Sequence, residues 1–115
     1  MTNTISLYEL IPGTVLSTND HSIDLYVGTL SELLIGVDVT AIDAATTLKV
    51  FVETKMPDGN YFAVWTSADI TATGLTSESI GAGLQTATSF GDQVRVRWTI
   101  TASKTATLSL TLIGK

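Results

Sequence analysis

The sequence contains no cysteine, a single histidine and only two prolines among its 115 residues. Without cysteine, the chain can form neither a disulfide framework nor a cysteine-based metal site. Nucleophilic catalysis by serine or threonine generally needs a nearby base, and a single histidine leaves few ways to supply one. The chain also has no uninterrupted apolar run of about 18 residues, the length that a membrane-spanning helix requires. We therefore expect no membrane insertion.

Charged residues are scarce as well, at 15% of the chain against about 25% in a typical soluble domain. Six are basic and eleven are acidic, which gives a net charge of −5. The basic residues are scattered, so no sequence patch could neutralise a phosphate backbone and we expect no nucleic-acid partner.

Residues 1–4 carry no basic residue and do not resemble a signal peptide. A hydrophobic fraction of 44% leaves two interpretations open: partners cover part of the surface, or threonine and serine solvate it.

What the chain does contain is alternation of apolar and polar residues, clearest in residues 93–100 and 105–112. Because a β-strand turns successive side chains to opposite faces, this pattern predicts strands with one buried and one solvated face. Further strands are expected at residues 5–10, 21–27, 33–40, 48–54, 61–65, 69–73 and 78–80.

Turn residues separate these strands. Pro57-Asp58-Gly59 predicts a hairpin, because proline fixes φ at the first corner and glycine accepts the positive φ that closes the turn. Pro12-Gly13 is expected to end the first strand. Residues 102–104 form a short connection, which predicts that the last two strands are antiparallel neighbours. The small-residue stretch 41–46 is expected to be a connector with at most a helical turn, and residues 81–91 are expected to form a surface loop.

Short strands without a convincing helix predict an all-β fold: an antiparallel β-sandwich, jelly-roll-like, with about eight short strands, or a squat barrel. We expect a single domain, in which residues 1–20 form an N-terminal strand or arm and residues 21–115 form the sandwich. The alternation assigns these residues to the core: Ile23, Leu25, Val27, Leu33, Ile35, Val37, Val39, Leu48, Val50, Val52, Val94, Val96, Trp98 and Ile100.

No catalytic constellation is evident in the sequence. His21 lies in a polar turn, no Gly-x-Ser-x-Gly elbow occurs, and we interpret this histidine as a solvated turn residue. Asp38 and Asp43 offer oxygens for calcium, yet nothing around them resembles a dedicated calcium loop. Gly81-Ala82-Gly83 lacks the Lys-Ser/Thr ending of a phosphate-binding loop. The sequence therefore predicts a protein that is not an enzyme, with no catalytic residue, metal site or cofactor.

Several side chains are candidates for surface contacts. Arg95 and Arg97 project from one polar strand face, and two roles stay open: cross-strand pairing with a carboxylate such as Glu53, or contact with a partner protein. Tyr26 and Phe51 are aromatic residues on otherwise polar faces, which favours their exposure.

The two tryptophans admit two interpretations. Exposed aromatic rings on a β-sandwich can stack on sugars, whereas buried ones pack in the core. Trp98 is in phase with the apolar face of its strand, and Trp65 shares a face with Tyr61 and Ala63 on a strand that is apolar on both sides. We expect both tryptophans to pack in the core.

From about Leu33 onward, the order of strands and turns is distinctive. A strand ending in Glu53-Thr54-Lys55 is followed by the Pro57-Asp58-Gly59 turn, an aromatic strand, Ile70-Thr71-Ala72-Thr73-Gly74, then Arg95-Val96-Arg97 and a threonine-rich last strand. This order resembles that of the head decoration (cement) proteins of tailed phages, over about two thirds of the chain. Those proteins usually have Glu-Ser or Glu-Asp before the turn, where this chain has Glu53-Thr54. Residues 1–30 match no family.

The resemblance implies a non-enzymatic virion protein, made in the host cytoplasm and bound to the capsid exterior. It implies a homotrimer that bridges and stabilises subunits of the major capsid protein, with no nucleic acid, membrane or small-molecule partner. The residues expected at interfaces are Ile5, Leu7, Tyr8, Tyr26, Gly81, Leu84, Gln85, Phe90, Arg95 and Arg97.

Alternatives from other classes stay open. A carbohydrate-binding module, or the receptor-binding module of a tail fibre, requires several aromatic residues exposed on one face. A head–tail connector or a tail component is a further possibility. A small hydrolase is disfavoured, because the sequence provides neither a base nor a setting for a nucleophile.

Overall fold

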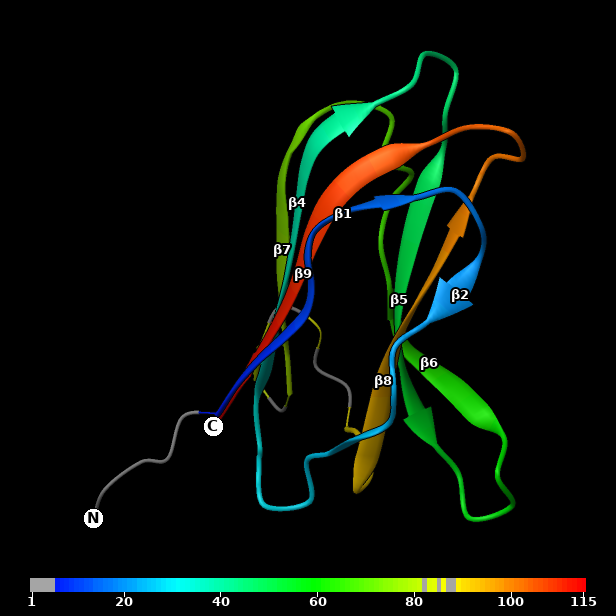
Figure 1. Cartoon of the computed structure of the whole chain (residues 1–115). Helices are drawn as coiled ribbons and strands as arrows, with labels where there is room; N and C mark the ends of the chain where they lie inside the picture. The colour runs from blue at the N-terminus through cyan, green and yellow to red at the C-terminus, as the bar shows by residue number, and fades with distance from the viewer. Residues whose placement is uncertain (1–5, 82, 85, 87–88) are drawn as a thin grey trace.

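The computed structural model of the chain describes residues 6–81, 83–84, 86 and 89–115, with backbone only for residues 6–9. In this part of the chain every regular element is a strand, and the strands form two layers that face each other (Figure 1). The strands are β1 (Ser6–Leu16), β2 (Asp20–His21), β3 (Leu25–Tyr26), β4 (Leu33–Ile42), β5 (Leu48–Lys55), β6 (Tyr61–Thr66), β7 (Gly74–Ile80), β8 (Gln93–Ile100) and β9 (Ala106–Gly114).

The strand order is that of a jelly roll. The first sheet has the order β1-β9-β4-β7, and the second has the order β2-β8-β5-β6, with β3 also paired to β8. If β2 and β3 are taken as two pieces of one edge strand, the chain changes sheet at every connection except the β5–β6 hairpin. All strand pairs are antiparallel. Two packed four-strand sheets built this way make a jelly-roll sandwich, which confirms the predicted fold class.

The core lies between the two sheets and is made by the central strands. In the first sheet, β4 and β9 bury every second residue, and in the second sheet β5 and β8 do the same. The apolar residues that these four strands bury are Leu33, Ile35, Val37, Val39, Leu48, Val50, Val52, Val94, Val96, Trp98, Ile100, Ala106, Leu108, Leu110 and Leu112. The period of two in the sequence therefore identified the buried faces correctly.

The prediction that the last two strands are neighbours in one sheet is wrong. β8 lies in the second sheet and β9 in the first, so residues 101–105 cross from one layer to the other. Ser103 adopts a positive φ of 64° in this crossing, and Asp43 accepts hydrogen bonds from the Thr105 backbone N–H and hydroxyl. A hairpin and a cross-sheet connection bury the same alternating residues, so alternation alone cannot distinguish them.

The prediction that the first strand ends at Pro12-Gly13 is also wrong. β1 continues to Leu16, with register shifts against β9 between Glu9 and Ile11 and between Ile11 and Thr14. β1 is an edge strand, so the missing N–H of a proline costs no ladder bond on the open side. Gly13 has a positive φ of 52° and donates its N–H to Ser109 Oγ, which replaces a ladder bond.

Two further strand predictions need correction. Residues 21–27 form β2 and β3 with a break between them, because Ser22 exchanges hydrogen bonds with Val96 through its backbone N–H and its hydroxyl oxygen. Ile23, predicted in the core, lies in this break and is 77% exposed. Residues 69–73 form no strand: Ile70 makes an isolated bridge to Leu48, and β7 starts at Gly74.

The connector at residues 41–46 contains no helical turn. β4 extends through Ile42, and the chain then turns at Ala45, whose φ is positive at 58°.

Candidate functional site

The outer face of the second sheet gathers most of the positive charge of the chain. Of the six lysine and arginine residues, Lys49 and Lys55 lie on β5, and Arg95 and Arg97 lie on β8. Lys49 pairs with Asp69 at 3.3 Å, and Lys55 pairs with Asp24 at 3.4 Å. This face therefore carries four of the six positive charges of the chain.

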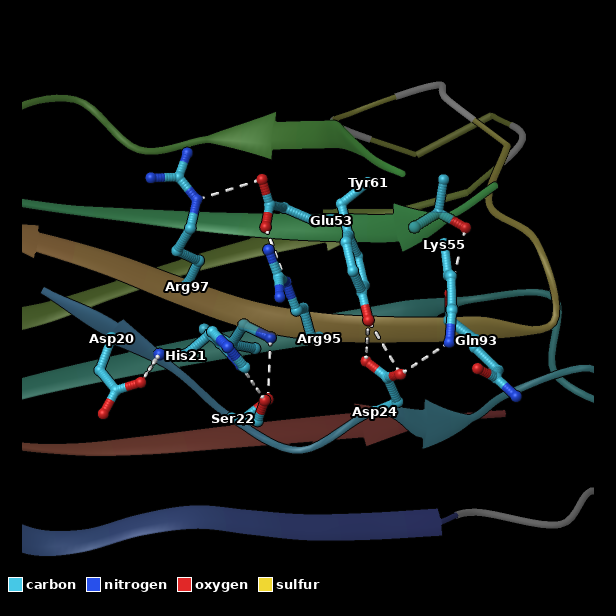
Figure 2. Close-up of polar contacts among 12 residues, drawn as sticks. Asp20, His21, Ser22, Asp24, Glu53, Lys55, Tyr61, Gln93, Arg95 and Arg97 are labelled. Carbon is cyan, nitrogen blue, oxygen red and sulfur yellow. Dashed lines mark hydrogen bonds and ion pairs between the residues drawn. The ribbon is translucent and has the colours of Figure 1, made fainter. Parts of the chain in front are cut away.

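Glu53 holds the two arginines together. The register of β5 and β8 places Glu53 opposite Arg95 and Phe51 opposite Arg97. Arg95 Nε donates to Glu53 Oε1 at 3.0 Å, and Arg97 Nε donates to Glu53 Oε2 at 3.1 Å (Figure 2). Glu53 is only 6% exposed, and its two bonds to cations offset the cost of removing a carboxylate from water. The predicted pairing of the arginines with Glu53 is thus confirmed.

Each arginine also lies over an aromatic ring. The guanidinium carbon of Arg95 is 3.5 Å from the centre of the Tyr61 ring, and that of Arg97 is 3.8 Å from the centre of the Phe51 ring. At such distances the ring face attracts the cation and restricts where the guanidinium can lie. We refer to Phe51, Glu53, Tyr61, Arg95 and Arg97 as the arginine cluster.

Asp24 adds a second carboxylate beside the arginine cluster. The Tyr61 hydroxyl lies 2.7 Å from Asp24 Oδ1 and 2.9 Å from Oδ2, and Lys55 Nζ lies 3.4 Å from Oδ2 (Figure 2). The Tyr61 hydrogen bond, followed by the hydrogen bond and charge of Lys55, holds the pKa of Asp24 below its ordinary value. The same bond to Asp24 raises the pKa of Tyr61.

Replacing Tyr61 by phenylalanine is expected to move the pKa of Asp24 upward, toward the ordinary aspartate value of about 3.9. In the native protein the lowered pKa makes Asp24 contribute stability above the pKa of the unfolded chain, and this contribution is lost as the pH falls through the native pKa. Carbon-detected NMR titration of the Asp24 carboxyl group measures the change. Tyr26→Phe is the control and should leave the titration unchanged, and an unaltered Asp24 pKa in Tyr61→Phe would contradict the assigned cause.

The remaining polar candidates are placed as follows. His21 pairs with Arg97 across β2 and β8, and its Nδ1 lies 2.7 Å from the Ser22 backbone oxygen on an exposed edge. Asp43 is exposed and bonded to Thr105, which holds its pKa below the ordinary value.

In the described part of the chain, no group of three histidine or acidic residues is arranged to hold a metal ion. Within the same residues, no helix is long and apolar enough to cross a membrane.

The tryptophans lie in or against the core. Trp98 is buried, and its indole Nε1 donates to the Thr18 backbone oxygen at 3.1 Å. Trp65 is half-buried and packs against the core, opposite Val52. Its face differs from the prediction, because β6 carries one extra residue, Val64, between Trp65 and Ala63. This bulge turns Val64 inward and separates Trp65 from the outward Tyr61 and Ala63.

Large apolar side chains are exposed at the edges of both sheets. Five of them, all between 60% and 77% exposed, lie on edge strands or in the break of one: Val15 on β1, Ile23 between β2 and β3, Tyr26 on β3, Phe62 on β6 and Leu75 on β7. Of these, only Tyr26 was a sequence candidate. The apolar character of both faces of β6 was a signal for Phe62 that sequence reasoning did not use.

The predicted interface residues are dispersed. Arg95 and Arg97 lie together, whereas Tyr26 is at the edge of the same sheet and Phe90 is half-buried against the core. Gly81 is buried with φ +148°, and Leu84 is half-buried beside it, lining an apolar hollow of about 240 Å³ with Leu34 and Ile113. Ile5 and Gln85 lie outside the described residues, as do the side chains of Leu7 and Tyr8.

Comparison with known proteins identifies a structural neighbour but no family. No family model and no curated protein matches the sequence. Among solved structures, the fold is similar to that of the SPBc2 prophage-derived protein YomS, with a TM-score of 0.61 and 10% sequence identity. The similarity covers 99% of this chain and 96% of that one. At this identity the likeness establishes that both chains share one jelly-roll fold.

Proposed function

We propose that the chain is a non-enzymatic structural protein of a tailed-phage virion. In this proposal it is a decoration, or cement, protein that binds the head exterior as a homotrimer and stabilises the shell by bridging subunits of the major capsid protein. The observation that carries the proposal is the set of exposed apolar residues along the sheet edges.

Sheet edges are the natural contact sites of such a protein. An edge strand presents unpaired N–H and C=O groups, and native proteins usually protect it with charge, proline or a short length. β6, with the sequence Tyr61 to Thr66, has no charged residue and no proline, and β7 carries only Glu78. Exposed Phe62 and Leu75 add apolar surface that a neighbouring subunit can cover. These features favour a protein partner over a small substrate.

Two further observations support a virion role. The structural neighbour is by its title prophage-derived, which is consistent with a phage source for this fold. Because jelly rolls serve many functions, the fold alone decides little. Among the described residues, the ring of His21 is hydrogen-bonded to the Ser22 backbone oxygen and to no serine or threonine hydroxyl, and both arginines of the second sheet pair with Glu53.

The test is binding of the purified chain to undecorated heads of the phage that encodes it, measured by co-sedimentation. We expect saturable binding, and we expect Phe62→Asp and Leu75→Asp each to weaken it at least about tenfold, equivalent to about 1.4 kcal/mol. Met56→Asp is the matched control, because Met56 is an exposed apolar residue that lies in the β5–β6 turn and not on an edge strand. Circular dichroism checks that each variant keeps the fold.

Three results would overturn the proposal. Absence of binding to heads removes the decoration role, and binding to tails instead assigns the chain to a tail component. Saturable binding to a glycan array favours the carbohydrate- or receptor-binding alternative, for which exposed Tyr26 and Phe62 would be the aromatic contacts.

A further inference from the structure

We propose that Arg95 and Arg97 form a carboxylate-binding site on the outer face of the second sheet, which takes an aspartate or glutamate side chain of a partner protein. The inference rests on the proposed function for the identity of that partner, which is then a head protein. The site itself follows from the geometry of the arginine cluster.

Most N–H donors of both arginines have no acceptor among the residues that the structure describes. A guanidinium has five N–H donors, and Glu53 accepts one from each arginine, at Nε. No other described residue accepts a hydrogen bond from either arginine, so the Nη1 and Nη2 groups have no protein acceptor in the described part of the chain. The Arg97 side chain is 33% exposed and that of Arg95 is 16% exposed, so solvent or a ligand can reach them. The free end of a guanidinium matches the two oxygens of a carboxylate.

The cluster also leaves one positive charge in excess. Each lysine on this face has a carboxylate of its own, since Lys49 pairs with Asp69 and Lys55 pairs with Asp24. The two arginines, in contrast, share the single carboxylate of Glu53. One further monoanion would therefore balance the cluster.

The two guanidiniums are held in position before any ligand arrives. Glu53 fixes both Nε atoms, and the rings of Tyr61 and Phe51 lie under the guanidinium planes. A side chain that is already ordered loses less conformational entropy on binding. A recognition site requires hydrogen-bond donors that are ordered and have no acceptor within the protein. A purely structural ion pair does not need such donors.

Shape and charge favour a protein carboxylate over other anions. The hollow next to the cluster, of about 530 Å³, is lined by Lys55, Met56 and Gln93 among others but by neither arginine. Small ligands prefer concave sites, and this hollow does not bring the two arginines to such a ligand. Asp24, Glu53 and the net charge of −5 repel polyanions such as nucleic acids.

The site can be tested by NMR, because the chain has only two arginines and thus only two Nε–Hε signals. The probe is an acetylated and amidated triglutamate peptide, with triglutamine and inorganic phosphate in parallel. We expect saturable shifts of both signals with triglutamate at about 1–10 mM, a range typical of a single weak contact, and none with triglutamine. Absence of saturable shifts, or tighter binding of phosphate, would overturn the assignment.

Variants separate the site from general electrostatics. Arg97→Gln is expected to weaken triglutamate binding at least fivefold, while Arg95 continues to pair with Glu53. The matched control, Lys104→Gln with Lys115→Gln, removes two positive charges elsewhere and is expected to bind like the wild type. If Arg97→Gln loses its fold, Arg97→Lys replaces it, because lysine keeps the positive charge but lacks the planar fork that matches a carboxylate. Equal weakening in the lysine control would overturn the inference.

Head binding then distinguishes the two proposals. If the wild type binds heads and Arg97→Gln binds them equally well, the inference fails and the proposed function stands. If the wild type binds triglutamate through Arg97 but does not bind heads, the carboxylate site stands and the proposed function fails.

Discussion

Replacing Glu53 by alanine is expected to lower the free energy of unfolding by about 3 kcal/mol, the lower end of the range for breaking a buried ion pair. The carboxylate of Glu53 is the acceptor for both Arg95 and Arg97, so its removal leaves two guanidiniums close together without a counterion. The effect lies at the lower end of the range because both arginines keep some contact with solvent.

Urea denaturation followed by tryptophan fluorescence measures this loss. The control is the triple variant Glu53→Gln, Arg95→Gln and Arg97→Gln, which removes all three charges and leaves neutral groups of similar size. Because replacing a whole ion-pair group costs less than removing one member, the triple variant is expected to be more stable than Glu53→Ala. A Glu53→Ala variant as stable as the wild type would show that the cluster contributes nothing to folding.

Replacing Leu110 by alanine is expected to destabilise the protein by about 2–5 kcal/mol. Leu110 is fully buried on β9, the strand that pairs with both β1 and β4 in the middle of the first sheet. Removing its branched end creates a cavity between the two sheets, where neither sheet can close without moving its neighbours.

Thr111 provides the matched control, since it is the next residue on the same strand and faces the other way. Thr111→Ala is expected to change stability by no more than about 0.5 kcal/mol. Chemical denaturation of both variants at one temperature makes the comparison. Similar losses for the two would mean that the alternation of β9 does not separate core from surface.

Much of the fold was predictable because alternation is a local property. The faces of β4, β5 and β8 follow from residue type alone, and the β5–β6 hairpin follows from Pro57-Asp58-Gly59. Which strands share a sheet was not predictable. The alternating residues of β8 and β9 contact the core equally well whether the two strands lie in one sheet or in two. That choice depends on how the whole chain closes around the core.

The candidate site was predictable only where its partners lie on regular strands. Arg95 and Arg97 share a face because they are two residues apart, and the sequence suggested Glu53 as their partner. The contact between Tyr61 and Asp24 was not visible, because Asp24 lies in the break between β2 and β3 and is 37 residues away. The bulge at Val64, which sets the orientation of Trp65, likewise has no signature in the sequence.

The place of β9 has a consequence for biosynthesis. This strand is translated after the other eight strands that the structure describes, yet it lies between β1 and β4 and joins them in the first sheet. While the ribosome still holds residues 106–114 in its exit tunnel, the first layer lacks its centre and β1 lacks the only ladder partner that the described strands offer it. The first layer therefore closes only after β9 has left the exit tunnel, and a premature stop codon before Ala106 yields a polypeptide that exposes the buried faces of β1 and β4 to proteases and chaperones.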